Sequence, residues 1–446
     1  MKLKLIYLLL TAAPLWVCGL QRVASAQLAT PSKPSGPAST LIHPTTPATA
    51  VEQNSNQFNI TGGQASGGAA PNVIHQFDRF DVRNGDQANF IVAPNVSNVV
   101  SLIDSPQPSS IYGTLQIQSN VPNVASNANL ILVNPEGLVF GESIQLNLSG
   151  DLTATTASGL LFSDTYHLDI DGVVSRAIIP GQDNTGNTNP SVANLTGPPT
   201  GYVFTDSDRS LPITNPLSTA LPVGSIHNKG TLALEPQSTL TLLGRYVQND
   251  GDIVASGGTA NLVAVTGDNL VRLSQPNNIL ALELISTDAI ALQSAAGIPQ
   301  TITGGDASQA NRIQSNTNGS QSLTSNSSLT TAPGSVLVRG SIDVSDRNGQ
   351  GTVNITAEQI NVIGSEISAN GINQGGFVSI GTESGIITED VMVNRSSAVS
   401  ANASAGQGGT IKIRAADTIR LYGDATANGT SPGNLDLKAG QTLDVR

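Results

Sequence analysis

Three pairs of acidic residues come closest to a catalytic spacing in this sequence. They are Asp169 with Asp171, Asp206 with Asp208, and Glu389 with Asp390. Two neighbouring carboxylates could act as acid and base in the hydrolysis or elimination of a polysaccharide. No pair has a cluster of Lys or Arg beside it in the sequence, and such acids are typical of solvated turns. We therefore predict no catalytic residues, with a polysaccharide-degrading enzyme as the alternative function.

The histidines and the cysteine give no sign of a metal site. His43, His75, His167 and His227 are scattered, and none has metal-ligand spacing to another His or to the single Cys. Gly-Gly-Asp at 304–306 lacks the nine-residue recurrence of calcium-binding repeats. The sequence therefore predicts neither a metal nor another cofactor.

The composition excludes several classes of protein. The chain has 446 residues with 45 Gly, only 8 Phe and 6 Tyr, which is too rich in glycine and too poor in aromatics for a helical enzyme of this size. Its formal net charge is −12. Nucleic acid is not expected as a partner, because phosphate contacts need clustered Lys or Arg.

The first 26 residues have the features of a signal peptide. Lys2 and Lys4 precede an apolar stretch over 5–20, and Ala24-Ser25-Ala26 supplies the small residues of a cleavage site. We expect cleavage after Ala26, since the apolar stretch is shorter than the roughly 20 residues of a spanning helix. The mature chain then lacks cysteine, so packing and hydrogen bonds must hold it together.

Short strands and regular turns follow a leader rich in Pro, Ser and Thr, which we place at 27–50. The stretch ANLILVNPEGLVFGESIQLNLSGDLTATTAS (128–158) alternates apolar and polar residues and is interrupted at Asn-Pro-Glu-Gly and at Ser-Gly-Asp. Pro135 fixes its own φ, and Gly137 tolerates a positive φ. The segment therefore predicts strands joined by tight turns.

The C-terminal part repeats itself. Residues 351–371 and 409–429 align without gaps and are identical at seven of 21 positions, including a terminal Ala-Asn-Gly. Four glycines that precede a strand are spaced by 25, 33 and 24 residues: Gly351, Gly376, Gly409 and Gly433. Such a repeat of short strands without helical periodicity predicts coils stacked about 4.8 Å apart, in which Asn at one corner can form a hydrogen-bonded ladder.

The predicted fold is therefore all-β: a right-handed parallel β-helix with an N-terminal cap and extra-helical β elements. A β-sandwich or propeller is the rival fold, but wide corners outnumber hairpin signals. Residues 286–335 lose the pattern and are predicted to be a flexible excursion rich in Ser, Asn and Gln, which separates β-helical coils at 51–285 from repeats at 336–446.

The repeats also predict which side chains face inward. Ile355 and Ile413 occupy matching strand positions and should be buried, whereas Asn354 and Lys412 should point outward. Ile355→Asp should then disrupt a coil, and Asn354→Asp should be nearly neutral.

The strands around the first turn resemble a known family. NPEGLVFG followed by LNLSGDLTATTAS is similar to the Asn-Pro-Asn-Gly-Ile signature of the two-partner secretion domain in filamentous-haemagglutinin-like exoproteins. Upstream, NVIHQFDRFDVRNGDQANFI (72–91) and SIYGTLQI (110–117) resemble further segments of that domain. Two departures are Glu136 in place of the central Asn, and Ala93-Pro94-Asn95 in place of an Asn-Pro element.

The resemblance covers about 51–285 and implies a transport route. Such exoproteins are exported to the periplasm by the Sec machinery, are recognised there by a dedicated outer-membrane transporter, and are threaded unfolded to the outside. The matching secretion motif is Asn134, Pro135, Glu136 and Gly137, a stretch that also suits a simple coil corner. We therefore expect a secreted or cell-surface protein, an adhesin or surface-binding protein with a glycan or cell-surface ligand.

Overall fold

The computed structural model describes residues 36–163, 165–176, 190–205, 222–267, 269–272, 283–286, 312–315, 321–324, 333–383 and 385–446. The chain divides into two units, Met1–Ser35 and Gly36–Arg446. The predicted cleavage site at Ala24 and Ala26, the start of the leader and most of the predicted excursion lie outside the described residues. Within those residues, no helix combines the length and the hydrophobicity needed to cross a membrane.

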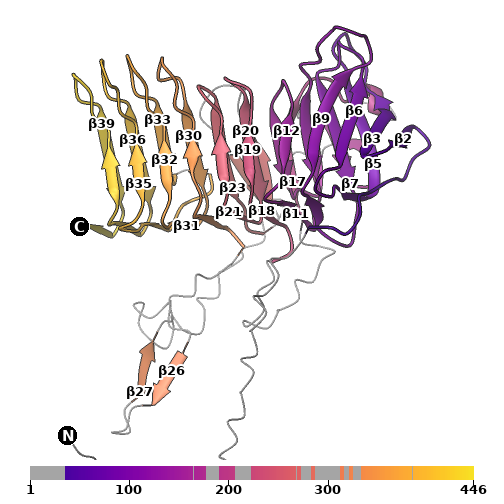
Figure 1. Ribbon diagram of the computed structural model, residues 1–446. Coiled ribbons are helices and arrows are strands. Elements are labelled where there is room, and N and C mark those ends of the chain that lie inside the picture. Colours follow the sequence, from indigo (N-terminus) through magenta and orange to yellow (C-terminus); the bar gives the residue numbers. More distant parts are fainter. Residues whose placement is uncertain are drawn as a thin grey trace, which may run out of the picture. The chain divides into compact units, whose positions relative to one another are not determined.

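The repeating unit is a coil of three short strands, each on a different face of a solenoid (Figure 1). In one coil these are β30 (Thr352–Thr356), β31 (Gln359–Val362) and β32 (Glu366–Ser368), after which β33 (Phe377–Ile380) returns to the face of β30. β33 pairs with β30 in parallel, as β34 (Asp390–Val393) does with β31. The predicted all-β parallel β-helix with a cap and extra-helical elements is confirmed.

Three stacks of strands form the faces. The first face contains β1 (Leu41–Pro44), β4 (Gln64–Ala65), β5 (Asn72–Asp81), β7 (Asn98–Ile103), β10 (Asn129–Val133), β13 (Leu152–Thr155), β20 (Thr239–Gly244), β23 (Thr259–Ala264), β30, β33, β36 (Thr410–Ala415) and β39 (Asn434–Ala439). The second face contains β8 (Ser109–Ile111), β11 (Gly137–Phe140), β18 (Ser225–Asn228), β21 (Tyr246–Asn249), β28 (Ser335–Val338), β31, β34, β37 (Thr418–Leu421) and β40 (Thr442–Val445).

The third face is divided into two sheets. Its N-terminal sheet contains β2 (Thr49–Asn54), β3 (Gln57–Gly62), β6 (Gln87–Val92), β9 (Thr114–Ser119) and β12 (Gln145–Asn147). Its C-terminal sheet contains β19 (Thr231–Ala233), β22 (Asp252–Val254), β29 (Ile342–Asp343), β32, β35 (Ala398–Ser400) and β38 (Asp424–Thr426).

The extra-helical elements form a separate sheet, here called the outer sheet. It consists of β14 (Gly159–Phe162), β15 (Tyr166–Asp169), β16 (Val174–Arg176), β17 (Pro199–Phe204), β24 (Asn269–Arg272) and β25 (Glu283–Ser286). A 3-10 helix, η1 (Val192–Asn194), precedes β17, and β26 (Arg312–Ser315) pairs with β27 (Gln321–Thr324) as a hairpin.

Apolar side chains fill two cores. The larger core runs inside the coils and includes Val99 and Ile103 of β7. The smaller core contains Val100 and Leu102 of the same strand together with Phe162 of the outer sheet. β7 is therefore buried on both sides, which explains why its sequence is almost continuously apolar.

Two predicted boundaries differ from the structure. The predicted leader extends to residue 50, but β1 begins at Leu41, where Ile42 is buried in the core and pairs with Phe80 of β5. The predicted boundary at 285 does not coincide with an end of the helix either. The chain leaves the coils after β23, and β24 pairs with β17 of the outer sheet before β28 resumes the coils.

The glycine spacing correctly predicts the register of the C-terminal coils. The four glycines directly precede β30, β33, β36 and β39, which pair in this order. The gapless alignment fails in the middle strand, however, because Ile360 is in register with Val391 and Ile419 rather than with Thr418. One extra residue in the corner before β37 is compensated before β38, since wide corners accept a residue more or less.

The four side chains point to the predicted sides of their strands, but Asn354 is more buried than an outward residue was expected to be. Ile355 and Ile413 are 1% and 0% exposed inside the coil. Asn354 points away from this core but is only 8% exposed, and its Nδ2 donates to Asn261 Oδ1 at 2.9 Å. From this contact we expect Asn354→Asp to be destabilising rather than nearly neutral, because a carboxylate there loses the donor and lies beside another oxygen.

Asparagine ladders run between coils as predicted for the Ala-Asn-Gly corner. Asn402 N donates to Asn370 Oδ1, and Asn428 N donates to Asn402 Oδ1, both at 2.7 Å. The corner thus satisfies backbone donors that no strand partner could reach.

We predict that Ile355→Ala lowers the free energy of unfolding by about 2 to 5 kcal/mol, because it removes buried methyl groups and leaves a cavity. Ser379→Ala is the matched control, since Ser379 lies on the next coil in register with Asn354 and is half-buried; its effect should stay within about 0.5 kcal/mol. Urea denaturation followed by circular dichroism measures both. Equal losses for the two variants would contradict the assignment of the inward face.

Candidate functional site

The predicted secretion motif forms the corner between β10 and β11. Asn134 Oδ1 accepts a hydrogen bond from Glu136 N at 2.9 Å, and Asn134 O accepts one from Gly137 N at 3.0 Å. Asn134 Nδ2 donates to Ser109 Oγ at 3.0 Å, in the preceding coil. Asn134 is 0% exposed. This one side chain therefore closes the turn and joins it to the neighbouring coil.

Position 137 tolerates few residues other than glycine. Its φ is +135°, in the region that favours glycine, and a Cβ there would lie 2.8 Å from Ser225 O in the following coil. Pro135 is buried, whereas Glu136 is half-buried. The backbone carbonyl of Glu136 accepts a hydrogen bond from Gly224 N in the following coil. The shape of the turn therefore depends on Asn134, Pro135 and Gly137 more than on the side chain at 136.

A ladder of backbone hydrogen bonds connects this corner to the rest of the coils. Gly224 N donates to Glu136 O at 3.1 Å, Arg245 N to Gly224 O at 2.9 Å, and Gly334 N to Arg245 O at 2.6 Å. The same ladder continues through Glu358, Glu389, Asp417 and Gln441. The motif is thus the N-terminal part of a corner that extends into the last coil.

Both long insertions leave the helix at this same corner. The first separates β13 from β18, and the second separates β23 from β28. Thr156 Oγ1 donates to Gly224 O at 2.9 Å, which holds together the two ends of the first insertion. Between these ends lie β14 to β17 of the outer sheet, and the second insertion adds β24 and β25. The coil of Asn134 is instead closed by its own four-residue turn.

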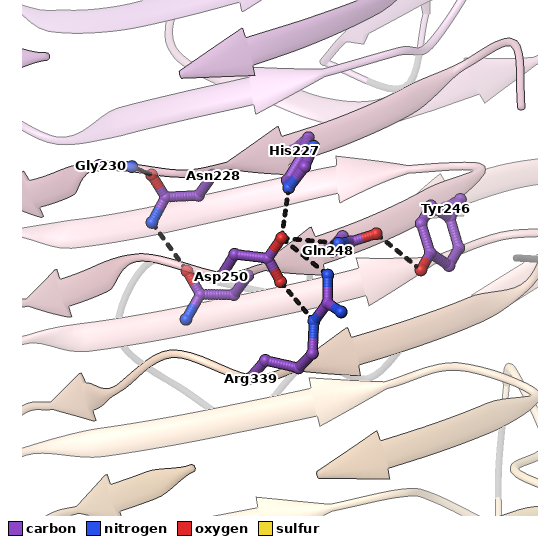
Figure 2. Close-up of polar contacts among 8 residues, drawn as sticks. His227, Asn228, Gly230, Tyr246, Gln248, Asp250 and Arg339 are labelled. Carbon is purple, nitrogen blue, oxygen red and sulfur yellow. Dashed lines mark hydrogen bonds and ion pairs between the residues drawn. The ribbon is translucent and has the colours of Figure 1, made fainter. Parts of the chain in front are cut away.

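A partly buried polar cluster on the second face was not predicted from the sequence (Figure 2). His227 Nε2 lies 2.7 Å from Asp250 Oδ2, and Gln248 Nε2 donates to the same oxygen at 2.7 Å. Arg339 approaches Asp250 with Nε at 2.7 Å from Oδ1 and Nη2 at 2.9 Å from Oδ2. Tyr246 OH donates to Gln248 Oε1 at 3.1 Å. The cluster joins three successive coils.

Asp250 stays ionised in this cluster. Burial alone would raise the pKa of its carboxyl group, but hydrogen bonds from His227, Arg339 and Gln248 outweigh burial and hold the pKa well below its usual range. Burial raises the pKa of Tyr246. Asp250 and Arg339 are 89 residues apart in the sequence and meet only because the second insertion leaves the coils and returns. No local pattern could have revealed them.

The structure describes two of the three predicted acidic pairs. Asp169 Oδ1 accepts Val173 N at 2.7 Å in a turn, and Asp171 is exposed beside it. Asp206 and Asp208 lie outside the described residues. Burial raises the pKa of Glu389, as do the nearby charges of Glu358, Asp417 and Asp390. Glu358, Glu389 and Asp417 occupy equivalent corners of successive coils. Thr266 Oγ1 donates to Glu358, and Gln441 Nε2 donates to Asp417 Oδ1.

His75 of β5 is the most deeply buried histidine that the structure describes. It is 0% exposed, and its ring centroid lies 6.2 Å from Phe77 and 5.6 Å from Phe90. Nδ1 is 3.1 Å from Thr49 Oγ1, whereas Nε2 finds no partner among the described residues. Burial lowers the pKa of His75 to about 4. Over the described ranges, no group of three or more His, Cys, Asp or Glu could hold a metal ion.

Comparison with known proteins gives a family match. The family model of the TPS secretion domain matches residues 38–328. The crystal structure of the HMW1 secretion domain from Haemophilus influenzae is 15% identical over 91% of this chain and 99% of that chain, with a TM-score of 0.45. That of the filamentous hemagglutinin secretion domain is 14% identical over the same shares, with a TM-score of 0.35. A comparison with curated proteins finds no match.

A capped β-helix with the Asn-Pro-Glu-Gly corner in its N-terminal coils defines a solenoid of the secretion-domain class. Because the family match spans more than half of the 446 residues, the chain belongs to the TPS secretion domain family. The family implies export by a two-partner secretion system, with an outer-membrane transporter as partner. It is a secretion domain rather than an enzyme family. The predicted resemblance is thereby confirmed.

We predict that Gly137→Ala lowers the free energy of unfolding by about 1 to 3 kcal/mol, through strain at a positive φ and contact with Ser225 O. Gly85→Ala separates the two causes, because Gly85 has a φ of +84° but no other atom lies within 4 Å of where its Cβ would be. The control should therefore lose less stability in thermal melts. An equal loss would show that the contact with Ser225 contributes nothing.

His75 predicts a dependence of stability on pH. Its folded-state pKa of about 4 lies below the unfolded value of about 6.5, so the unfolded chain binds the proton more readily between these limits. The contribution of His75 is intact above pH 6.5 and is progressively lost as the pH falls towards 4, by up to about 3 kcal/mol. His75→Phe should reduce the difference between melts at pH 7 and pH 4.5. His43→Phe, at an exposed histidine, should leave the difference unchanged.

Proposed function

We propose that this chain is an exoprotein whose N-terminal domain is recognised by its outer-membrane transporter through the corner 134–137, and whose folded coils act outside the cell as an adhesin or surface-binding protein. The observation that carries the proposal is the family match over 38–328, which includes this corner. The predicted signal peptide ending at Ala26 would direct the chain through the Sec machinery to the periplasm.

The construction of the coils supports export of an unfolded chain. Each coil contacts mainly its neighbours, so folding can propagate along the chain as it emerges, without waiting for distant segments. Cys18 is the only cysteine and lies in the predicted signal peptide, so the mature chain would have no disulfide to block threading. Folding on the outside would then oppose backward movement.

The proposed site of recognition is the turn as an extended motif, before the coils form. In the folded domain Asn134 and Pro135 are buried, so the transporter would meet these side chains only while the chain is unfolded. Glu136 replaces the Asn of the family signature, yet its two backbone contacts do not require a particular side chain.

We expect that deletion of the host's two-partner transporters abolishes export of the chain, measured as the amount of protein in the medium. Replacement of Pro135 and Gly137 by Ala together should reduce export severalfold, whereas Glu136→Asn should leave it close to wild type. Gly364→Ala is the matched control. Gly364 lies in a C-terminal coil far from the motif and has a φ of +65°, at which an Ala would be strained. Unchanged export in the transporter-deficient host would contradict the proposal. Equal export of the Pro135 and Gly137 double variant and of the Gly364 control would show that the corner has no role in recognition.

A further inference from the structure

The outward side of the third face in the N-terminal domain is rich in side-chain amides. β3, β6, β9 and β12 alternate core residues such as Phe58 and Phe90 with polar residues that point outward. One row across these strands aligns Gln57, Gln87, Thr114 and Gln145 in register. We call the outward surface of these four strands the amide face.

A second row lies beside the first. It aligns Asn59, Asn89, Gln116 and Asn147 on the same four strands. Adjacent strands are about 4.8 Å apart, so the first row spaces its polar groups at a repeat close to one sugar residue of an extended polysaccharide. Gln145 and Asn147, at the β12 edge of the rows, are exposed to solvent.

The amide face differs in charge from the surface around it. The sequences of β3, β6, β9 and β12 contain no charged residue, in a chain of net charge −12. Glu52 of β2, opposite Asn59, is the charge at its edge. The C-terminal sheet of the same face presents exposed acids instead: Asp252, Asp343, Glu366 and Asp424. An anionic ligand would be repelled there, and a cationic one would find no partner on the amide face.

Contacts within the rows hold the amides in place. Asn89 Nδ2 donates to Asn59 Oδ1 and to Gln118 Oε1, both at 2.9 Å. Asn89 is 1% exposed and Gln116 is 8% exposed, so these two amides brace the middle strands, and the exposed Gln145 and Asn147 are the groups that a ligand can reach. Side chains that are already ordered lose little entropy on binding.

We propose that the amide face binds an uncharged polysaccharide, with amide groups hydrogen-bonded to sugar hydroxyls on successive strands. This inference rests on the proposed surface-binding function and names its site and its ligand class. Affinity comes from several equivalent contacts along one chain rather than from a single pocket. Sugar rings do not stack here, because the aromatic residues of these strands face the core.

The test is electrophoresis of the exported protein in gels that contain a soluble polysaccharide. A neutral β-glucan or mannan should slow the protein, and heparin and polygalacturonate should not. Gln145→Ala with Asn147→Ala should weaken binding about tenfold, since both substitutions remove hydrogen-bonding groups. Gln118→Lys provides a second variant at an exposed position. The matched control is Asn434→Ala with Gln441→Ala, two exposed amides in the last coil.

The outcomes separate this inference from the function on which it rests. Retardation by neutral probes that the amide-face variants lose and the control keeps supports it. No retardation by any neutral probe, retardation by charged probes alone, or equal losses in variants and control overturns it. If the exported protein still adheres to cells when the amide face is altered, surface binding stands and the amide face is not its site. If it adheres to nothing, the proposed binding function itself fails.

Discussion

Parallel hydrogen bonding between successive coils is the constraint on which the rest of this structure depends. It fixes which residues lie above one another, so each coil must present apolar side chains inward and small residues at crowded corners. A Cβ at Gly376 would lie 2.3 Å from Gly351 O, and one at Gly409 would lie 2.1 Å from Gly376 O. These glycines are required by the backbone of the preceding coil, which is why their spacing reveals the register.

The same register decides where polar groups can be buried. A polar side chain that recurs in one position of successive coils finds its partner in the next coil, as Asn98 Nδ2 does with Asn72 Oδ1 at 2.7 Å. Asp250 satisfies its charge in the same way, with His227 on one side and Arg339 on the other. Stacking does not by itself supply an opposite partner, however. Glu358, Glu389 and Asp417 lie in consecutive corners, and their mutual repulsion contributes to the raised pKa of Glu389.

Sequence reasoning succeeded where a rule acts within one coil or between equivalent positions. The inward places of Ile355 and Ile413, the glycines before the first-face strands and the turn at 134–137 all follow from such rules. It failed where distant insertions meet. The pairing of β17 with β24 and the meeting of Asp250 with Arg339 depend on where the chain returns after leaving the helix. Local patterns carry no information about that return.

A solenoid whose coils fold on their neighbours needs a first edge on which to begin. In this chain the N-terminal coils provide that edge through a cluster of large side chains. The ring centroid of Phe80 lies 5.3 Å from that of Phe77 and 6.1 Å from that of Phe90. The core of the later coils consists of smaller Val, Ile and Ala residues, so a single coil on its own buries little apolar surface. Asn134 joins the next corner to this cap through Ser109. The turn at 134–137 is therefore joined to the coils that contain this cluster, and the corner that it starts continues to the last coil.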